Sequence, residues 1–519
     1  MNKKLLAVAV AGALAAPGVA LAQSTVTITG TFKVSMDQVN ISGGSSDATG
    51  VRIGNTGASL VNTALSGPAG RTNTSERRVS DNSSKIIFAV REDLGNGLAA
   101  IAQLDQRFDP PTLNGALGAA GAGFAATGGG NTWVGLDSKS WGRLTMGSHD
   151  LHYGKGGDSI NSAGAGSLQM WSSSIFDSIG KPAPAAAAAA AGGVVAATAT
   201  GAHSSLASQS RTRGVVRWDS PNFNGAEVLI AWSAHPLCPG SGGGCTGGDL
   251  GQNVAPGSTL AWNAGNAGGT NGLAGTGPNA GQMITRKGDG WNINPKYNAA
   301  NWGVEYSYWN AKGDLNNQSN VNLLTPVTLT TVGTTTAPAV VNTTGYSAQD
   351  DQRSDVIAGY YTTSGFRIGL AWNHSKTTAP ASGLVTGDRT SWVFPVSYNT
   401  GPHTFAMAYT KANDSKDITR NTGTAWGQTS GQYPITAATT GYSYTVSGAG
   451  TGASMFTMGY QYDLSKRTAL GLSYGRLANR AAANYGFFYN AQTVFGSANA
   501  GASPGETHSL AAATIRHNF

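Results

Sequence analysis

The chain has 519 residues, of which 11% are charged, and its 33 Lys and Arg against 26 Asp and Glu give a net charge of +7. Soluble domains carry roughly 25% charged residues, so this composition argues against a soluble protein, and the scattered positive charge excludes a nucleic-acid patch. Beyond the N-terminal segment, no run of strongly apolar residues is long enough to cross a bilayer as a helix. A membrane protein without such helices must be a closed barrel, because only helices and barrels satisfy every backbone hydrogen bond in hydrocarbon.

Residues 1–22 are expected to be a cleaved export signal. Two lysines begin it, residues 5–16 are apolar, and Ala20–Ala22 forms a small-residue cleavage site. A buried N-terminal helix is the alternative, and these flanking residues disfavour it. We therefore expect one domain over residues 23–519. It has 31 basic residues (33 minus the two in the signal) against 26 acidic ones, a net charge of +5.

Sixteen segments alternate apolar and polar residues, which is the pattern of strands with one lipid-facing and one polar face. The first seven are 25–37, 85–91, 98–105, 131–136, 142–149, 211–219 and 226–234. The other nine are 291–297, 302–309, 355–361, 366–373, 392–398, 405–409, 456–462, 470–474 and 508–519. Pro395 is a local misfit in the twelfth segment, and such a residue is tolerable at a bulge.

Short and long connections alternate between these segments. Tight joints such as 93–97, 363–365 and 463–468 alternate with long, mostly polar stretches. The long stretches are approximately 38–83, 108–130, 150–210, 235–287, 312–352, 376–388, 413–453 and 478–507. This rhythm predicts an all-β, 16-stranded antiparallel transmembrane β-barrel with short periplasmic turns and long extracellular loops. A soluble β-sandwich also alternates, but it has no reason to place every long loop at one end.

Residues that could support catalysis or bind a metal are few. Cys238 and Cys245 lie in the glycine-rich stretch CPGSGGGC, and outside the cytosol we expect a local disulfide between them. His149 and His152 lack the partners that would complete a metal site, and the chain contains no G-x-S-x-G elbow. We therefore expect no enzymatic activity, no metal and no cofactor.

Strand parity places basic side chains on the face opposite the apolar one, where they would line a polar lumen. They are Lys33, Lys85, Arg91, Arg107, Arg143, Arg211, Arg213, Arg217 and Arg367. Arginine on the lipid face near the bilayer midplane would cost roughly 2–4 kcal/mol, which favours the lumen. The alternative is that some of them lie at the rim and bind lipopolysaccharide phosphates or a neighbouring subunit.

Acidic residues of the 150–210 stretch would face these cations and set a transverse field at the narrowest point of the lumen. They are Asp150, Asp158 and Asp177. Because basic groups outnumber acidic ones on the expected wall, the sequence predicts a pore with a weak preference for anions.

Several motifs resemble the trimeric general-diffusion porins of Gram-negative outer membranes, in particular those of β-proteobacteria. They are TVTITG in the first strand, SKIIFAVREDLGNGLAAIAQLD at 84–105, WVGLDSKSWGRLTMG at 133–147, VVRWDSPNFNGAEV at 215–228, YDLSKRTALGLSYG at 462–475 and the terminal IRHNF. The DLSKRT turn and the RHNF end are the most specific. The chain departs from the family at Ser148, where an arginine is usual, and residues 150–210 lack a recognisable acidic signature.

The resemblance implies a homotrimer whose third long loop, about 150–210, folds into the barrel. It also implies a water-filled channel for passive diffusion of small hydrophilic solutes and ions. The other implied partners are outer-membrane lipid, lipopolysaccharide and the barrel-insertion machinery, which would read the terminal Phe519 as an assembly signal. Phe519 could instead be an ordinary interface aromatic. The rival function is an adhesin or ligand-binding barrel that acts through its long surface loops, and single-channel conductance distinguishes the two.

Overall fold

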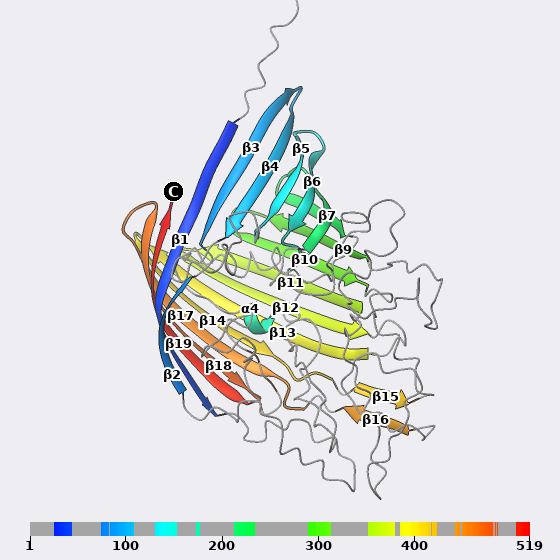
Figure 1. Cartoon of the computed structure of the whole chain (residues 1–519), viewed down its shortest axis with the longest axis vertical. Helices are drawn as coiled ribbons and strands as arrows, with labels where there is room; N and C mark the ends of the chain where they lie inside the picture. The colour runs from blue at the N-terminus through cyan, green and yellow to red at the C-terminus, as the bar shows by residue number, and fades with distance from the viewer. Residues whose placement is uncertain are drawn as a thin grey trace, which may run out of the picture.

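The computed structural model describes the strands and tight turns of the chain and parts of its loops (Figure 1). The described residues are 25–43, 74–81, 84–107, 130–152, 173–176, 212–233, 289–312, 351–378, 385–416, 418–422, 442–446, 449–480, 483, 485 and 505–519. Most of these residues are in β-strands. In this part of the chain there is no helix of the length and apolarity needed to span a membrane.

One antiparallel sheet forms the barrel. Its strands are β1 (Thr25–Gly43), β2 (Thr74–Asp81), β3 (Lys85–Gly95), β4 (Leu98–Arg107), β5 (Thr132–Ser138), β6 (Gly142–His149), β7 (Thr212–Asp219), β8 (Ala226–Ser233), β9 (Gly290–Asn298), β10 (Trp302–Ala311), β11 (Asp351–Thr363), β12 (Phe366–Thr378), β13 (Val385–Thr400), β14 (His403–Ala412), β17 (Ala453–Asp463), β18 (Thr468–Asn479) and β19 (Glu506–Asn518). From β3 onward each strand pairs with the next barrel strand along the chain, and β1 pairs with β19 to close the barrel (Figure 1).

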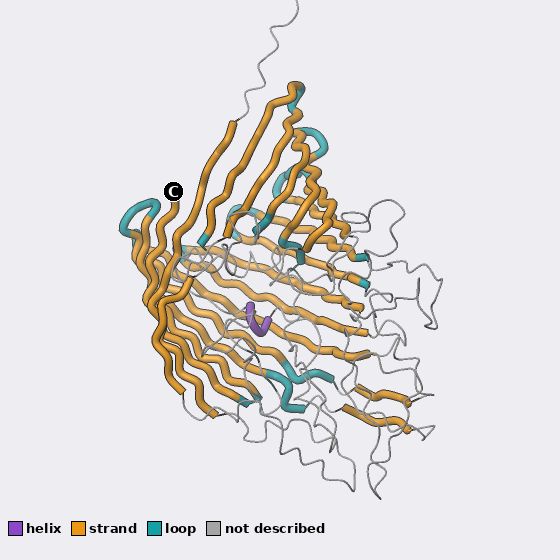
Figure 2. Tube along the Cα trace, in the orientation of Figure 1, coloured by secondary structure: helices purple, strands orange, loops and turns teal. Residues whose placement is uncertain are grey.

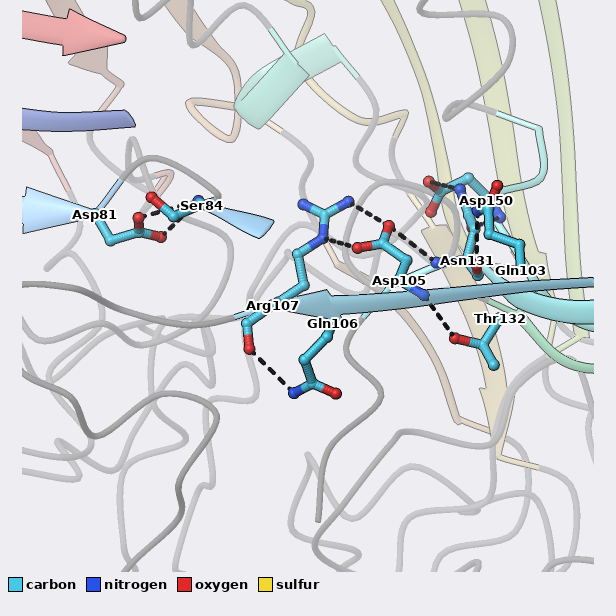
Figure 3. Close-up of polar contacts among 9 residues, drawn as sticks. All are labelled: Asp81, Ser84, Gln103, Asp105, Gln106, Arg107, Asn131, Thr132 and Asp150. Carbon is cyan, nitrogen blue, oxygen red and sulfur yellow. Dashed lines mark hydrogen bonds and ion pairs between the residues drawn. The ribbon is translucent and has the colours of Figure 1, made fainter. Parts of the chain in front are cut away.

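The second strand of the wall is interrupted. β1 pairs with β3 over Thr25–Thr31 and with β2 over Val34–Ile41, so β2 and β3 follow one another along the same edge of β1. At the break, the backbone N–H of Ser84 donates to both carboxylate oxygens of Asp81, at 3.0 and 3.2 Å (Figure 3). Counting β2 and β3 as one strand, the 17 strands of the sheet make 16 wall strands.

All sixteen predicted segments are strands, and the predicted barrel is confirmed. The strands are longer than predicted at the long-loop end: β1 continues to Gly43, for example, and β13 begins at Val385. The long connection expected over 38–83 is wrong at both ends, because it contains the end of β1 and all of β2. A separate hairpin, β15 (Ile418–Thr422) with β16 (Tyr442–Val446), lies within the stretch expected as the 413–453 loop.

Side chains alternate between an exposed apolar outer face and a buried, mostly polar inner face. On β12, Leu370 is 57% exposed and Trp372 is 40% exposed, whereas Ala371 between them and Asn373 and Ser375 beyond them are buried. The outer face therefore suits hydrocarbon, and the inner face carries the hydrogen-bonding groups.

Pro395 lies within β13 without a bulge. The register between β12 and β13 is the same on both sides of it, since Ile368 pairs with Val396 and Ala371 with Val393. Between these two pairs, Gly369 and Leu370 of β12 are not paired with β13, because Pro395 has no N–H to donate. A Cβ on Gly369 would lie 3.0 Å from the Pro395 ring, so the glycine leaves room for it. The sheet therefore accommodates Pro395 without a bulge.

Phe519 completes the junction between the first and last strands. Its N–H donates to the carbonyl of Gly30, and the Gly30 N–H donates to the Phe519 carbonyl, both at 3.1 Å. Its ring lies 5.7 Å from that of Phe32 and directly over Gly30, where a Cβ would come within 2.2 Å of the ring. Only glycine at position 30 allows the ring to lie there.

A single helical turn, α4 (Ser173–Phe176), belongs to the 150–210 stretch. Figure 2 shows it in purple over the strands of the sheet, and its close neighbours are β13, β14 and β17. The side chains that it contacts, described below, belong to the inner face of the barrel.

Candidate functional site

Charged side chains form a row on the inner face at the short-turn ends of β3 to β7. Arg91 lies 2.7 Å from one carboxylate oxygen of Asp137, and Arg143 lies 3.6 Å from the other. Arg143 is also opposite Asp219 in the register of β6 and β7. Asp219 in turn accepts two hydrogen bonds from Arg217, at 2.6 and 2.9 Å. These five residues, which we call the arginine row, alternate positive and negative charge across the wall.

The arginine row exposes its positive charges more than its negative ones. The side chains of Arg91 and Arg143 are 52% and 48% exposed, whereas those of Asp137 and Asp219 are 25% and 29% exposed. Three guanidinium groups against two carboxylates leave one positive charge uncompensated. Arg217 is only 13% exposed, so an ion in the lumen meets the guanidinium groups of Arg91 and Arg143 first, and these two attract anions.

A second basic group lies on the inner face where the barrel closes. Lys33 of β1 is opposite Arg516 of β19, and Lys85 of β3 is opposite Arg107 of β4. Asp105 accepts two hydrogen bonds from Arg107, at 3.0 and 3.1 Å (Figure 3). Asp81, at the break between β2 and β3, interacts electrostatically with Lys33. This closure cluster of four basic residues and two carboxylates adds to the positive charge of the wall.

Asp150 lies at the start of the predicted third loop, next to the closure cluster. Its carboxylate accepts the side-chain N–H of Asn131 at 2.9 Å, and its backbone N–H donates to the Asn131 side chain at 2.7 Å (Figure 3). The backbone N–H of Asn131 donates to Asp105 at 3.3 Å. Asn131 therefore links Asp150 to the closure cluster.

The two histidines of the HDLH stretch have different partners. His149 lies 3.2 Å from the Thr145 hydroxyl and stacks on Trp133. His152, in the connection after β6, lies 2.9 Å from the Ser307 hydroxyl. Burial lowers the pKa of His152 to about 3, so the imidazole is neutral at physiological pH. His152 therefore contributes no positive charge to the lumen.

The helical turn α4 is hydrogen-bonded to the inner face. The carbonyl oxygen of Phe176 accepts the hydroxyl of Ser391 at 2.7 Å and the side-chain N–H of Asn373 at 3.0 Å. The carbonyl oxygen of Ile175 accepts an N–H of Arg389 at 2.6 Å. The side chains of Ile175 and Phe176 are buried in two inner apolar clusters. The turn therefore takes up part of the space inside the barrel.

The structure brings together some of the predicted pore-lining residues. Arg91, Arg143 and Arg217 join the arginine row, Lys85 joins the closure cluster, and Asp150 lies beside that cluster. Arg213 is in β7, but its side chain is not described. The predicted residues outside the described part of the chain are Arg211, Asp158, Asp177, Cys238 and Cys245. The disulfide between the two cysteines stays a prediction.

Five inner-face residues are absent from the predicted site. They are Asp105, Asp137, Asp219, Arg389 and Arg516. Asp137 and Asp219 lie at predicted turns, and carrying the strand parity to the ends of the strands would have placed both on the lumen side. Arg389 has no such signal, because it lies between the expected loop 376–388 and the first apolar residue of the twelfth segment.

Known proteins resemble this chain in sequence family and in structure. A sequence model described as Gram-negative porin matches residues 7–343 and 326–482. The structure is similar to the anion-selective porin from Comamonas acidovorans, with a TM-score of 0.51 and 15% identity over 96% of this chain and 100% of that one. It is also similar to OmpT of Vibrio cholerae, with a TM-score of 0.45 and 10% identity over 96% of this chain and 98% of that one. No curated protein sequence is significantly similar to the chain. At these identities the structural likeness to the Comamonas protein supports the fold alone.

Proposed function

We propose that this member of the Gram-negative porin family, a non-enzymatic diffusion channel in the outer membrane, weakly prefers anions. The observation that carries the proposal is the excess of basic groups on the inner face. The arginine row has three arginines and two aspartates, and the closure cluster has four basic residues and two aspartates. Fixed charges lining a water-filled pore raise the local concentration of the opposite ion, so anions are favoured.

The test is the reversal potential of the purified protein in a planar bilayer between two KCl solutions of different concentration. We expect a sign that corresponds to faster passage of chloride than of potassium. The preference should weaken as the salt concentration rises, because screening shortens the reach of wall charges to about 3 Å at 1 M salt. A strong preference for potassium would overturn the proposal.

We also infer that three copies associate through the sector formed by β19 and β1 to β6. Every barrel strand from β7 to β18 carries a Trp or Tyr on its outer face, as expected at the boundary between lipid and water. The strands of the sector contain one Trp and no Tyr. That residue, Trp133, faces inward and stacks on His149, so the outer face of these strands has neither. The outer residues of the sector are mostly aliphatic instead, among them Ile28, Met36 and Val134, and the exposed aromatic residue Phe32 is a phenylalanine. Contact with a second subunit accounts for an apolar face without an aromatic belt.

We propose that the 150–210 stretch narrows the channel. The support for this is that α4, the described turn of that stretch, is bonded to the inner face through Ser391, Asn373 and Arg389. Solute size, rather than chemistry, then limits passage, and we expect small hydrophilic solutes to diffuse and large ones to be excluded. Liposome swelling with sugars of increasing mass measures this limit, and equal rates for all sugars would contradict it.

We propose that the outer rim at the long-loop end contacts lipopolysaccharide. Arg353 lies on the outer face of β11, 63% exposed, with its guanidinium 5.5 Å from the ring of Tyr308. Lys376 lies at the same end of β12. Lys411 lies at that end of β14, opposite Trp392 of β13. Cations just beyond an aromatic belt are well placed for lipid phosphates. Replacing Arg353, Lys376 and Lys411 by glutamine should reduce the lipopolysaccharide that copurifies, and an unchanged amount would contradict the proposal.

A further inference from the structure

Arg389 is a buried cation on the inner face of β13. It is 2% exposed, and among the described residues no carboxylate lies within ion-pair distance of it. One terminal nitrogen donates to the hydroxyl of Tyr485 at 2.5 Å, and the other donates to the carbonyl of Ile175 at 2.6 Å. A guanidinium that is buried and bonded to a tyrosine and to a backbone carbonyl is held in one defined position.

The guanidinium joins three segments that are far apart in the sequence. Arg389 belongs to the wall, Ile175 to α4, and Tyr485 to the connection between β18 and β19. A planar guanidinium presents five N–H groups in a fixed fork, so it can hold two partners at once in a defined geometry. Lysine or an apolar side chain cannot reproduce that geometry.

The last carbonyl groups of α4 depend on the wall for their hydrogen bonds. A helix leaves its final carbonyls without partners inside the helix, and here Arg389 serves Ile175 while Ser391 and Asn373 serve Phe176. A positive charge at a helix C-terminus also interacts favourably with the helix dipole. One isolated helical turn is not stable in water, so these contacts decide where α4 lies.

The third partner, Tyr485, is itself fixed in place. Its N–H donates to the side-chain oxygen of Asn479 at 2.8 Å, and its carbonyl accepts the Asn479 side-chain N–H at 2.9 Å. Its ring is buried in the same apolar cluster as Ile175. Tyr485 therefore braces the guanidinium from the side opposite the wall.

We propose that Arg389 is a positioning residue that anchors α4 to the wall through this three-segment joint. The consequence for transport rests on the proposed narrowing of the channel by the 150–210 stretch. With the anchor intact, α4 stays against β12 and β13 and the open cross-section is constant. Without it, the buried carbonyl of Ile175 loses its donor, α4 is held less firmly to the wall, and the channel fluctuates between wider and blocked states.

The experiment measures the anchor and the channel separately. In a background with Cys238→Ser and Cys245→Ser, the substitution Phe176→Cys introduces a thiol at a position that is 2% exposed. We expect this thiol to react slowly with a charged maleimide in the folded trimer and many times faster when Arg389→Met is added. Reaction rates that are equal with and without Arg389→Met would overturn the anchor.

Single-channel recording of Arg389→Met, without the added thiol, measures the effect on the channel. We expect a larger maximal conductance, frequent partial closures and a lower voltage at which the channel closes. Arg217→Met is the matched control for charge, because it also removes one inner-face guanidinium but its partner is Asp219 of the wall. That control should shift ion preference without adding closures, and closures of equal frequency in both variants would overturn the anchor.

Tyr485→Phe tests the joint in a variant that keeps the charge. It removes one hydroxyl, so we expect closures of intermediate frequency, and heat-resistant trimers on gels show that each variant has folded. Rapid thiol reaction with unchanged conductance would support the anchor and refute instead the narrowing by the 150–210 stretch. The failure of the two proposals is thereby distinguishable.

Discussion

At the scale of single residues, the exposure of each charge decides how the inner wall acts on an ion. Arg217 is 13% exposed and neutralised by Asp219, so it mainly stiffens the wall. Arg91 and Arg143 share a single carboxylate, Asp137, and both face the lumen. Exposed pairs of this kind contribute little to stability, so their substitution changes the field in the pore more than the fold.

Replacing both Arg91 and Arg143 by glutamine should therefore change selectivity. The change removes two positive charges and leaves Asp137 exposed and unneutralised. One unit charge at about 4 Å contributes about 1 kcal/mol in water before screening, so we expect the anion-to-cation permeability ratio to fall about two- to fivefold.

Reversal potentials in a salt gradient measure that ratio. Arg476→Gln is the matched control, because this arginine is exposed on the outer face of β18, opposite Phe456. A control that shifts the ratio as much as the double variant would contradict the role of the arginine row.

At the scale of strands, closure depends on the junction of β1 with β19. The ring of Phe519 lies over Gly30 and beside Phe32, so the shape of β1 and the terminal aromatic residue are matched. This contact and the proposed assembly signal place different demands on the same residue. The contact needs an empty space at position 30, whereas the signal needs only an aromatic end.

Gly30→Val should weaken closure without altering the terminal sequence. The added side chain overlaps the Phe519 ring, and overpacking of this kind costs about 1–3 kcal/mol. We expect the variant to reach the outer membrane in normal amount but to unfold at a lower temperature on heat-modifiability gels. Deletion of Phe519 should instead reduce the amount inserted. Equal loss of insertion in both variants would show that the ring acts through closure and not as a signal.

Strand parity predicted the barrel well because a lipid-facing strand needs an apolar residue at every second position. It failed for β2, whose sequence TSERRVSD contains one apolar residue, Val79. That strand is held by pairing with β1 and by the contact of Asp81 with Ser84, and neither is visible in a hydrophobic pattern. Arg389 was missed for a related reason, since its partners are two backbone carbonyls and a tyrosine that is 96 residues away.

At the scale of the whole molecule, the outer surface divides into two sectors. One has an aromatic belt and suits lipid, and the other is aliphatic and is proposed to contact neighbouring subunits. The division is continuous around the barrel, because β19 and β1 to β6 are consecutive in the sheet. Members of the porin family are typically trimeric, and this sector is where the present chain would meet its copies.

Val134→Trp tests that assignment. Val134 is 62% exposed in the aliphatic sector, and Leu472, 60% exposed on β18 in the aromatic sector, is its matched control. A tryptophan fits a lipid-facing surface but overpacks a subunit contact by about 1–3 kcal/mol. We expect Val134→Trp to lower the temperature at which trimers dissociate on gels and Leu472→Trp to leave it unchanged. The reverse result would place the subunit contact elsewhere.

The bonding of Gly30 to Phe519 also constrains when the barrel can close. Thr31 and Asn518, which share a side-chain hydrogen bond next to this junction, are 487 positions apart. Until the C-terminal strand β19 has paired with β1, the sheet has two unpaired edges, and such edges readily recruit other chains into aggregates. Pairing between such distant segments is also slow, because a very long loop must close first. Holding chaperones in the periplasm are therefore a requirement of this topology.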